Sequence, residues 1–368
     1  MLYLSIASRR CHVIAKKFLE HVSMTISRED QPHFTTYLAS KGYLTALQYA
    51  HQSGCQWSKD TCAEAALYGE LNTLHYAHEN GAPWNEDTCV NAAKSGSLMC
   101  LEYAMLNGCI NNAQHNTTIC REAAANGHVD CLAFAHENGC EWNEHATTNA
   151  AKYGRLECLK YIHEHGGKWD GWTMTLSALH GQVECVKYMH ENGCKYIDVR
   201  LNSLQMIFSP RLGPWHDEIS IAATAGGHLD TFKYAVEHGC PTPPEGFLCG
   251  VAAINGRLNM MKYLHEELGQ EWNSTGTSNS ALSGHLECVK YAHEHGCPWG
   301  EFTCLWASKQ GHLECLVYAH ENGAQWDEAV CSAGLANGHV HCVQYAHENG
   351  VPCSHNNPQN VTSFESQV

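Results

Sequence analysis

The segment from Thr303 to Glu328 reads TCLWASKQGHLECLVYAHENGAQWDE, and related segments return about every 27 residues along the chain. The aromatic residue that marks each copy is Tyr49, Tyr76, Tyr103, Phe134, Tyr161, Tyr188, Tyr234, Tyr263, Tyr291, Tyr318 and Tyr345. Successive steps are 27, 27, 31, 27, 27, 46, 29, 28, 27 and 27 residues. A period of this length is typical of stacked supersecondary repeats, so the 368 residues predict one elongated array.

Each repeat predicts two short helices. The first begins at Thr303 and is ended by Gly311, whereas the second begins at His312, has apolar residues at helical spacing and ends at Gly323. A glycine at that place favours a left-handed cap. Small residues in the first helix let a neighbouring helix approach closely, and the pairs are Ala65-Ala66, Ala92-Ala93, Ala123-Ala124, Ala150-Ala151 and Ala252-Ala253. The predicted fold class is an all-α, curved solenoid of helix-turn-helix repeats.

The charge balance excludes one class of partner. The chain has 22 Lys and Arg against 38 Asp and Glu, a net charge of −16, so its field repels phosphate backbones and we expect no nucleic-acid partner.

No run of eighteen apolar residues occurs, and Arg9, Arg10, Lys16 and Lys17 interrupt the N-terminal segment, so we expect neither a membrane span nor a signal peptide. A soluble, cytoplasmic protein is therefore predicted.

The 21 cysteines raise the question of zinc. Nineteen of them fall in three columns of the repeat, in the first helix, the second helix and the loop. Where a column lacks Cys it holds Thr, Met, Ala or Gly, as at Thr147, Met174, Ala82 and Gly167, so the position favours a small or apolar side chain. We therefore expect buried free thiols that act as compact apolar residues, and no metal.

Histidine and tryptophan form two further columns. The histidines are His51, His78, His136, His163, His190, His265, His293, His320 and His347, and Met105 and Val236 replace them in two copies. Apolar replacements predict a half-buried seam in which neutral imidazoles bond to adjacent loops, so that protonation loosens the stack. The tryptophans are Trp57, Trp84, Trp142, Trp169, Trp215, Trp272, Trp299 and Trp326. They form either structural plugs between loops or an aromatic binding stripe.

The segment Ala123-Ala124-Ala125-Asn126-Gly127-His128-Val129-Asp130 resembles the core of an ankyrin repeat, and the resemblance extends from about Tyr37 to Val351. Ankyrin repeats have about 33 residues, whereas these have about 27 and lack the Thr-Pro-Leu-His signature. The missing residues fall in the loop, so we expect the β-hairpin to be shortened or absent. Short repeats rich in Cys, His and Trp resemble the ankyrin-like paralogues common in giant DNA viruses of amoebae and in some protists. The resemblance implies a protein-binding array whose concave face is lined by first helices and turns.

The repeats define the domain boundaries. Residues 1–36 predict an N-terminal helical cap or short non-repeat segment, residues 37–353 an array of about eleven repeats, and residues 354–368 a disordered tail. An alternative for residues 1–36 is a faint resemblance to the last helix of an F-box, which implies a ubiquitin-ligase substrate receptor. An insertion at 195–213 carries Leu204, Met206, Ile207 and Phe208, and it is either a loop or helix packed on the array or a protruding partner contact.

Nothing in the sequence has the pattern of an active site. It contains no phosphate-binding glycine loop, nucleophile elbow or His-Glu-x-x-His helix, so we expect no enzyme, no cofactor and no small-molecule substrate. Variable positions just before the Ala-Ala pair are candidates for contact with a host or cellular protein, although drift on an unused surface gives the same pattern. These candidates are Glu64, Asn91, Arg121, Glu122, Asn149, Leu305 and Trp306.

Overall fold

The computed structural model describes residues 31–109, 113–194 and 215–351, and within them it contains 22 α-helices, one π-helical turn and no strand. The first helices of the repeats are α2 (Gln31–Ser40), α4 (Thr61–Leu67), α6 (Glu86–Ser95), α8 (Ala113–Asn126), α10 (Glu144–Lys152), α12 (Gly171–Leu179), α15 (Asp217–Gly226), α17 (Phe247–Ile254), α19 (Thr275–Leu282), α21 (Thr303–Lys309) and α23 (Glu328–Ala336). The second helices are α3 (Leu44–Gln52), α5 (Leu71–Glu79), α7 (Leu98–Leu106), α9 (Val129–Glu137), α11 (Leu156–Glu164), α13 (Val183–Glu191), α16 (Leu229–Glu237), α18 (Leu258–Lys262) with the π-helical turn η1 (Tyr263–Glu267), α20 (Leu286–Glu294), α22 (Leu313–Glu321) and α24 (Val340–Glu348). The predicted all-helical repeat solenoid is confirmed.

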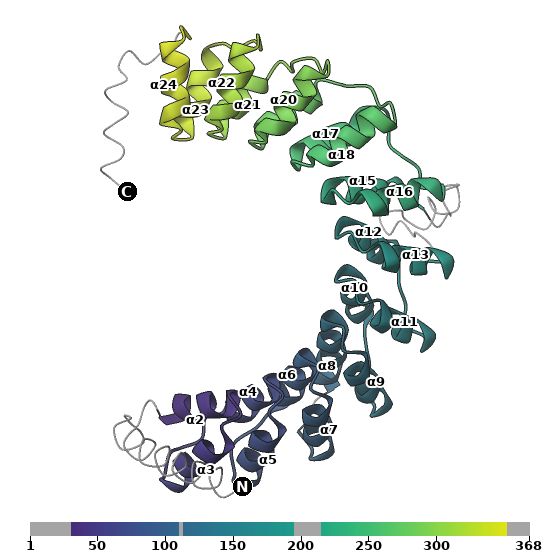
Figure 1. Cartoon of the computed structure of the whole chain (residues 1–368), viewed down its shortest axis with the longest axis vertical. Helices are drawn as coiled ribbons and strands as arrows, with labels where there is room; N and C mark the ends of the chain where they lie inside the picture. The colour runs from purple at the N-terminus through teal and green to yellow at the C-terminus, as the bar shows by residue number, and fades with distance from the viewer. Residues whose placement is uncertain (1–30, 110–112, 195–214, 352–368) are drawn as a thin grey trace, which may run out of the picture. The chain divides into compact units, whose positions relative to one another are not determined.

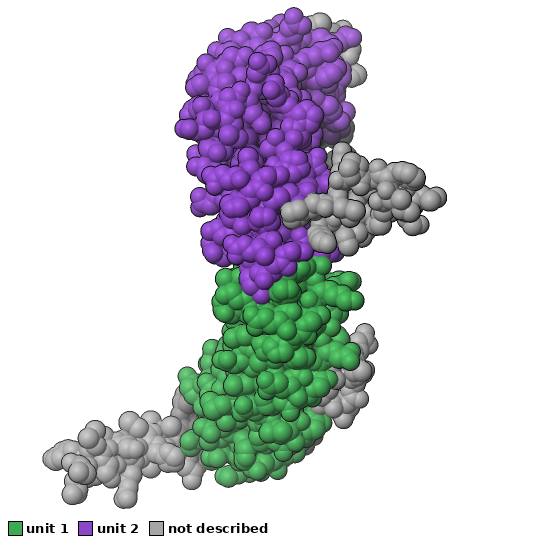
Figure 2. All heavy atoms as spheres, turned by 90° about the vertical axis from the view of Figure 1, so that its right-hand side faces the viewer, with its two compact units in different colours: residues 1–169 green, residues 170–368 purple. Residues whose placement is uncertain are grey.

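The chain divides into two compact units, residues 1–169 and 170–368 (Figure 2). In the N-terminal unit the first helices α2, α4, α6, α8 and α10 contact one another in sequence, and α3, α5, α7, α9 and α11 form a second row beside them (Figure 1). In the C-terminal unit the first helices follow one another from α12 through α15, α17, α19 and α21 to α23. Each repeat is therefore one helix pair that packs on its neighbours in the chain.

The first described repeat begins earlier than its sequence suggests. Helix α2 packs against α3 and α4 as the other first helices do, and it starts at Gln31, six residues before the expected boundary at 37. The cause is its sequence, which has none of the Ala-Ala or Cys signatures that mark other first helices. The F-box-like segment lies mostly within residues 1–30, outside the described residues, as do the tail 354–368 and the insertion 195–213.

Helix ends follow from local chemistry. Side-chain oxygens accept hydrogen bonds from backbone N–H groups at the start of several first helices, as Asp170 does from Thr173 N at 2.8 Å and Asp327 from Ala329 N at 2.9 Å. Second helices end on a glycine with positive φ, 86° at Gly323. Beyond it, Ala324 N donates to Ala319 O at 2.9 Å, which closes the predicted left-handed cap.

The core consists mainly of small and medium side chains. Ala65 and Ala66 are fully buried in α4, and Leu74 and Ala77 of α5 pack behind them. Toward the C-terminal end, Cys304, Leu316 and the partly buried Trp326 belong to one cluster that runs through six successive helices, from α19 to α24. Because each repeat leaves an apolar side for the next, burial continues along each compact unit.

The cysteines lie inside this core. Eighteen described cysteines are free and buried, as predicted, whereas Cys331 is disulfide-bonded, so the prediction of a free thiol is wrong there. Burial raises the pKa of the Cys304 thiol to about 12, so it stays protonated at neutral pH. Loop thiols do more than fill space, because Cys297 Sγ donates to Asn273 O at 3.2 Å and Cys109 Sγ to Asn85 O at 2.9 Å. These bonds tie the loop after the second helix to the start of the first.

The histidine column forms the predicted seam between repeats, but with a different partner. In six of the nine copies the imidazole Nδ1 meets the tyrosine hydroxyl of the next second helix rather than a loop. The pairs and their Nδ1 to Oη distances are His51–Tyr76 at 3.0 Å, His78–Tyr103 at 2.8 Å, His136–Tyr161 at 3.3 Å, His190–Tyr234 at 3.0 Å, His293–Tyr318 at 3.1 Å and His320–Tyr345 at 2.9 Å. We call each such pair a latch.

Tryptophan completes each latch by packing against the imidazole, with ring centroids 3.6 to 4.6 Å apart. The ring centroids of His78 and Trp84 are 3.6 Å apart with an interplanar angle of 20°, and Trp84 also faces Tyr103 at 6.1 Å. Trp57 Nε1 donates to Asn80 O of the next repeat at 3.0 Å. The tryptophans therefore act as plugs between repeats, which was one of the two predicted roles.

One latch is rewired by the π-helical turn. The copy that begins at Leu258 carries an extra residue before its closing Gly269, and η1 absorbs it inside the helix. As a result His265 Nδ1 reaches Gln270 O of its own loop at 3.2 Å. Tyr291 Oη donates instead to the Glu266 carboxylate.

A second seam involves the glycine that ends each first helix. Gly311 has φ 78°, and a Cβ on it would lie 2.6 Å from Nδ1 of His339 in the next repeat. Arg155 covers Gly127 in the same way and donates from Nε to Ala125 O at 3.2 Å. Because glycine has no Cβ, the neighbouring side chain packs directly against its Cα, and we call this contact the glycine seat.

Candidate partner-binding face

The predicted contact residues lie on the first helices, all of them half-buried. Those in the N-terminal unit are Glu64 on α4, Asn91 on α6, Arg121 and Glu122 on α8, and Asn149 on α10. Because these helices are consecutive neighbours, the structure brings the five side chains into one row. Leu305 and Trp306 lie on α21 in the C-terminal unit and form a separate group.

Three members of the row have structural partners of their own. Asn91 Nδ2 donates to Ala63 O of the preceding repeat at 3.1 Å, which leaves less of the amide for a ligand. Arg121 Nη2 lies 3.1 Å from Glu122 Oε1, so the two opposite charges neutralise each other on the surface. A half-buried ion pair of this kind at the surface contributes little to stability, and a partner can replace either member.

In the C-terminal unit Trp306 lies beneath an ammonium group. Lys309 Nζ is 4.9 Å from the ring centroid of Trp306, one helical turn away on α21. Leu305 packs partly against the C-terminal core. The insertion residues Leu204, Met206, Ile207 and Phe208 lie outside the described residues.

Sequence reasoning missed a set of exposed aromatic residues. Trp172 is 53% exposed, Phe247 47% and Phe302 48%, and each stands nine residues before the glycine that ends its first helix. We call these three residues the aromatic row. Their signal was available in the sequence, because aromatic residues there replace polar ones such as Asp60 and Asp87 of other copies. Tyr37, Tyr68 and Tyr153 are similarly exposed in the N-terminal unit, at other positions of the repeat.

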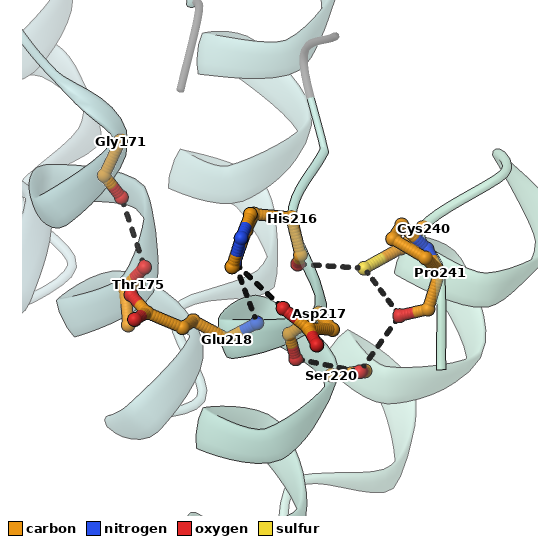
Figure 3. Close-up of polar contacts among 8 residues, drawn as sticks. All are labelled: Gly171, Thr175, His216, Asp217, Glu218, Ser220, Cys240 and Pro241. Atoms are coloured by element: carbon orange, nitrogen blue, oxygen red, sulfur yellow. Dashed lines mark hydrogen bonds and ion pairs between the residues drawn. The ribbon is translucent and has the colours of Figure 1, made fainter. Parts of the chain in front are cut away.

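Carboxylates accompany the aromatic row. Asp217 and Glu218 begin α15, beside the first turn of α12 with Gly171 and Thr175 (Figure 3). His216 Nδ1 lies 2.7 Å from Asp217 Oδ1.

The loop after α16 holds the start of α15 in place. Ser220 Oγ donates to Asp217 O at 2.8 Å and to Pro241 O at 3.0 Å, and Cys240 Sγ donates to His216 O at 3.3 Å (Figure 3). The backbone that carries Asp217 and Glu218 is thus fixed on both sides.

Among the described residues, no group of three or more His, Cys, Asp or Glu side chains is placed to hold a metal ion. In the same part of the chain, no helix is both long and apolar enough to cross a membrane.

Comparison with known proteins identifies the repeats. Two family models match the chain, one described as ankyrin repeats (3 copies) at residues 121–200 and one described as ankyrin repeats (many copies) at residues 304–347. No curated protein sequence matches the chain significantly. Among solved structures, the crystal structure of the human ASB11 ankyrin repeat domain aligns with a TM-score of 0.39 and 21% identity, over 49% of this chain and 93% of that one. The two family matches identify ankyrin repeats, which are protein-interaction modules, within residues 121–200 and 304–347.

Proposed function

We propose that this chain, as a carrier of ankyrin repeats, is a non-enzymatic scaffold that binds a host or cellular protein through the exposed face of its first helices. One observation carries the proposal. The buried positions of the repeat are nearly constant, whereas exposed positions on the first helices change from copy to copy and include aromatic residues. A constant frame with a variable, partly aromatic surface is typical of a recognition surface.

The exposed apolar residues support this face over the other one. Trp172, Phe247 and Phe302 belong to first helices or their leading turns. The second helices carry exposed aliphatic residues such as Met99 and Leu106, and their charged residues form local pairs, for example Lys187 Nζ to Glu184 Oε1 at 2.8 Å. Large aromatic side chains dominate interface energies, so the first-helix face is the better candidate.

The proposed setting is the cytoplasm, of the host cell if the chain is viral. Eighteen free, buried thiols suit a reducing compartment.

Affinity capture with immobilised full chain tests the proposal. The variant Trp172→Ala/Phe247→Ala/Phe302→Ala removes exposed aromatic area from the first helices, and Met99→Ala/Leu106→Ala/Leu268→Ala removes exposed apolar area from the second-helix side. We expect a partner that the wild type and the second variant retain and the first one loses, as read by quantitative mass spectrometry. Equal loss in both variants, or no specific partner at all, contradicts the assignment.

A further inference from the structure

The aromatic row recurs in alternate repeats of the C-terminal unit. Trp172 at α12, Phe247 at α17 and Phe302 before α21 occupy equivalent positions, and the repeats between them carry Glu218 and Thr275 there. All three rings are about half exposed. Since first helices of successive repeats contact one another in order, the rings lie along one edge of a single layer.

The same edge is strongly acidic. The six first helices of this unit, with the turns that lead into them, contain Asp170, Asp217, Glu218, Glu245, Glu271, Glu301, Asp327 and Glu328. Among the described residues of these helices and turns, the only Lys or Arg residues are Lys168, in the turn that leads into α12, and Lys309. Asp170 and Asp327 also serve as N-caps, whereas Glu245, Glu271 and Glu301 lie exposed in the turns.

We propose that this edge, from α12 to α23, binds an extended basic peptide segment of a partner protein, with Lys or Arg about every third residue. The inference rests on the proposed function and names the chemistry of its partner. Exposed aromatic faces attract guanidinium and ammonium groups and pack against their aliphatic stems. One or two carboxylates per repeat supply the matching charge.

Geometry sets the spacing. Neighbouring helices lie about 8 to 10 Å apart, and an extended chain in the polyproline II conformation rises about 3.1 Å per residue with about three residues per turn, so that every third side chain lies on the same side. Three residues of an extended peptide therefore advance it by about one repeat. The aromatic row, present in alternate repeats, meets every second basic side chain.

Charge excludes other occupants of this edge. A second copy of this chain would bring its own acidic edge and a net charge of −16, so the two would repel each other. Nucleic acid and anionic lipid are repelled for the same reason.

The N-terminal unit provides the internal comparison. Its first helices also begin with carboxylates, as at Asp60 and Asp87, because acidic residues stabilise helix N-termini in both units. At the positions of the aromatic row, however, it carries His33, Asp60, Asp87, Thr118 and His145. Carboxylates alone are thus common to both units, and the aromatic row distinguishes the C-terminal one.

Fluorescence anisotropy with synthetic peptides tests the inference. The probe is a fluorescein-labelled peptide of six Arg-Ser-Gly triplets, about 18 residues, which is the length needed to cross six repeats. Its isomer has the same composition with all arginines in one block. We expect the full chain to bind the triplet peptide at least about fivefold more tightly than the isomer, because only the triplet spacing matches successive repeats.

Substitutions in the full chain locate the site. At about threefold per ring, Trp172→Ala/Phe247→Ala/Phe302→Ala weakens binding of the triplet peptide about 30-fold. Glu245→Gln/Glu271→Gln/Glu301→Gln weakens it about tenfold or more at low salt, because screening is then smallest. The matched control Tyr37→Ala/Tyr68→Ala/Tyr153→Ala removes equally exposed rings from the N-terminal unit and changes the affinity less than about twofold.

The inference is overturned if the two peptides bind with equal affinity, or if removing the aromatic row has no effect. Binding would then be explained by non-specific charge attraction. A captured partner that depends on the first-helix face but has no basic segment also overturns it while the proposed function stands. Circular dichroism of each variant shows whether the array is still folded, and since the substituted side chains are exposed we expect unchanged spectra.

Discussion

The hydroxyl of Tyr291 donates to Glu266 Oε1 at 2.8 Å, at the position where six other tyrosines meet an imidazole. The π-helical turn makes this exchange, because one extra residue moves His265 out of reach and moves Glu266 into its place. A carboxylate strengthens the bond and raises the pKa of Tyr291, after burial as the first cause. The joint between these two repeats therefore lacks the imidazole found at the other latches.

The first prediction concerns pH. Burial lowers the pKa of His78, His136 and His190, and His165 and His238 add a like charge beside His136 and His190, while Glu137 and Glu191 oppose the shift. The unfolded chain then binds more protons than the folded one, so stability is lost as pH falls through about 6.5. We expect the melting temperature to fall between pH 7.5 and 5.5 by circular dichroism. His78→Gln/His136→Gln/His190→Gln is expected to melt lower at pH 7.5 but with a flatter pH dependence, and a parallel shift in both proteins would remove these histidines as the cause.

The second prediction concerns a missing latch. Met105 replaces the histidine in one copy, and Phe134 replaces the tyrosine of the next one. Installing both partners, Met105→His with Phe134→Tyr, should add one hydrogen bond between repeats, whereas either change alone adds a polar group without its partner. We expect a favourable coupling of about 0.5 to 1 kcal/mol from a double-mutant cycle in urea. Additive effects would show that the backbone at this joint does not bring the pair together.

The third prediction separates backbone strain from contact between repeats. Gly311 and Gly323 both have positive φ, 78° and 86°, but a Cβ would meet His339 at Gly311 and nothing within 4 Å at Gly323. Each substitution by Ala costs about 1 kcal/mol for the left-handed conformation, and Gly311→Ala costs about 1 to 3 kcal/mol more through overpacking. Urea denaturation measures both. When His339 is also replaced by Ala, Gly311→Ala and Gly323→Ala should lower the free energy of unfolding by similar amounts. A difference that persists would show that contact with His339 is not the reason for the larger effect at Gly311.

The fourth prediction concerns thiol reactivity. Burial raises the pKa of Cys62, Cys194 and Cys304 to about 12, so little thiolate forms near neutral pH and the sulfur is covered. We expect iodoacetamide at pH 7.5 to leave these three cysteines unmodified in the native chain and to modify them in urea, as read by peptide mass spectrometry. Rapid native labelling of Cys304 would mean that the C-terminal repeats open locally.

The sequence predicted which helices form, but it did not predict which residues of neighbouring repeats contact each other. The column of His293 and its equivalents was recognised as a half-buried seam, since Met105 and Val236 replace it, yet the facing Tyr318 was not identified. Periodicity fixes which side of a helix is covered, but it does not show which residue of the next repeat lies opposite. The step of 28 residues after Tyr263 showed an insertion without showing that the helix itself absorbs it.

The candidate face was predicted in position but not in composition. Glu64, Asn91 and Arg121 lie on first helices, as expected, because the variable column was counted from the Ala-Ala pair. Trp172 was missed because its column varies, and a single sequence does not separate a chosen aromatic residue from a tolerated one. Exposure of the ring in the folded chain marks it as a candidate contact.

The glycine seat has a consequence for how such a chain changes during evolution. His339 over Gly311 and Arg155 over Gly127 use the same joint, although the side chains differ. Since a repeat carries one such glycine and one side chain that covers the glycine of its neighbour, duplication or deletion of a whole repeat leaves both halves of the contact in place. The number of repeats can therefore change by gene rearrangement without loss of this contact, whereas a break inside a repeat separates the glycine from the side chain that covers it.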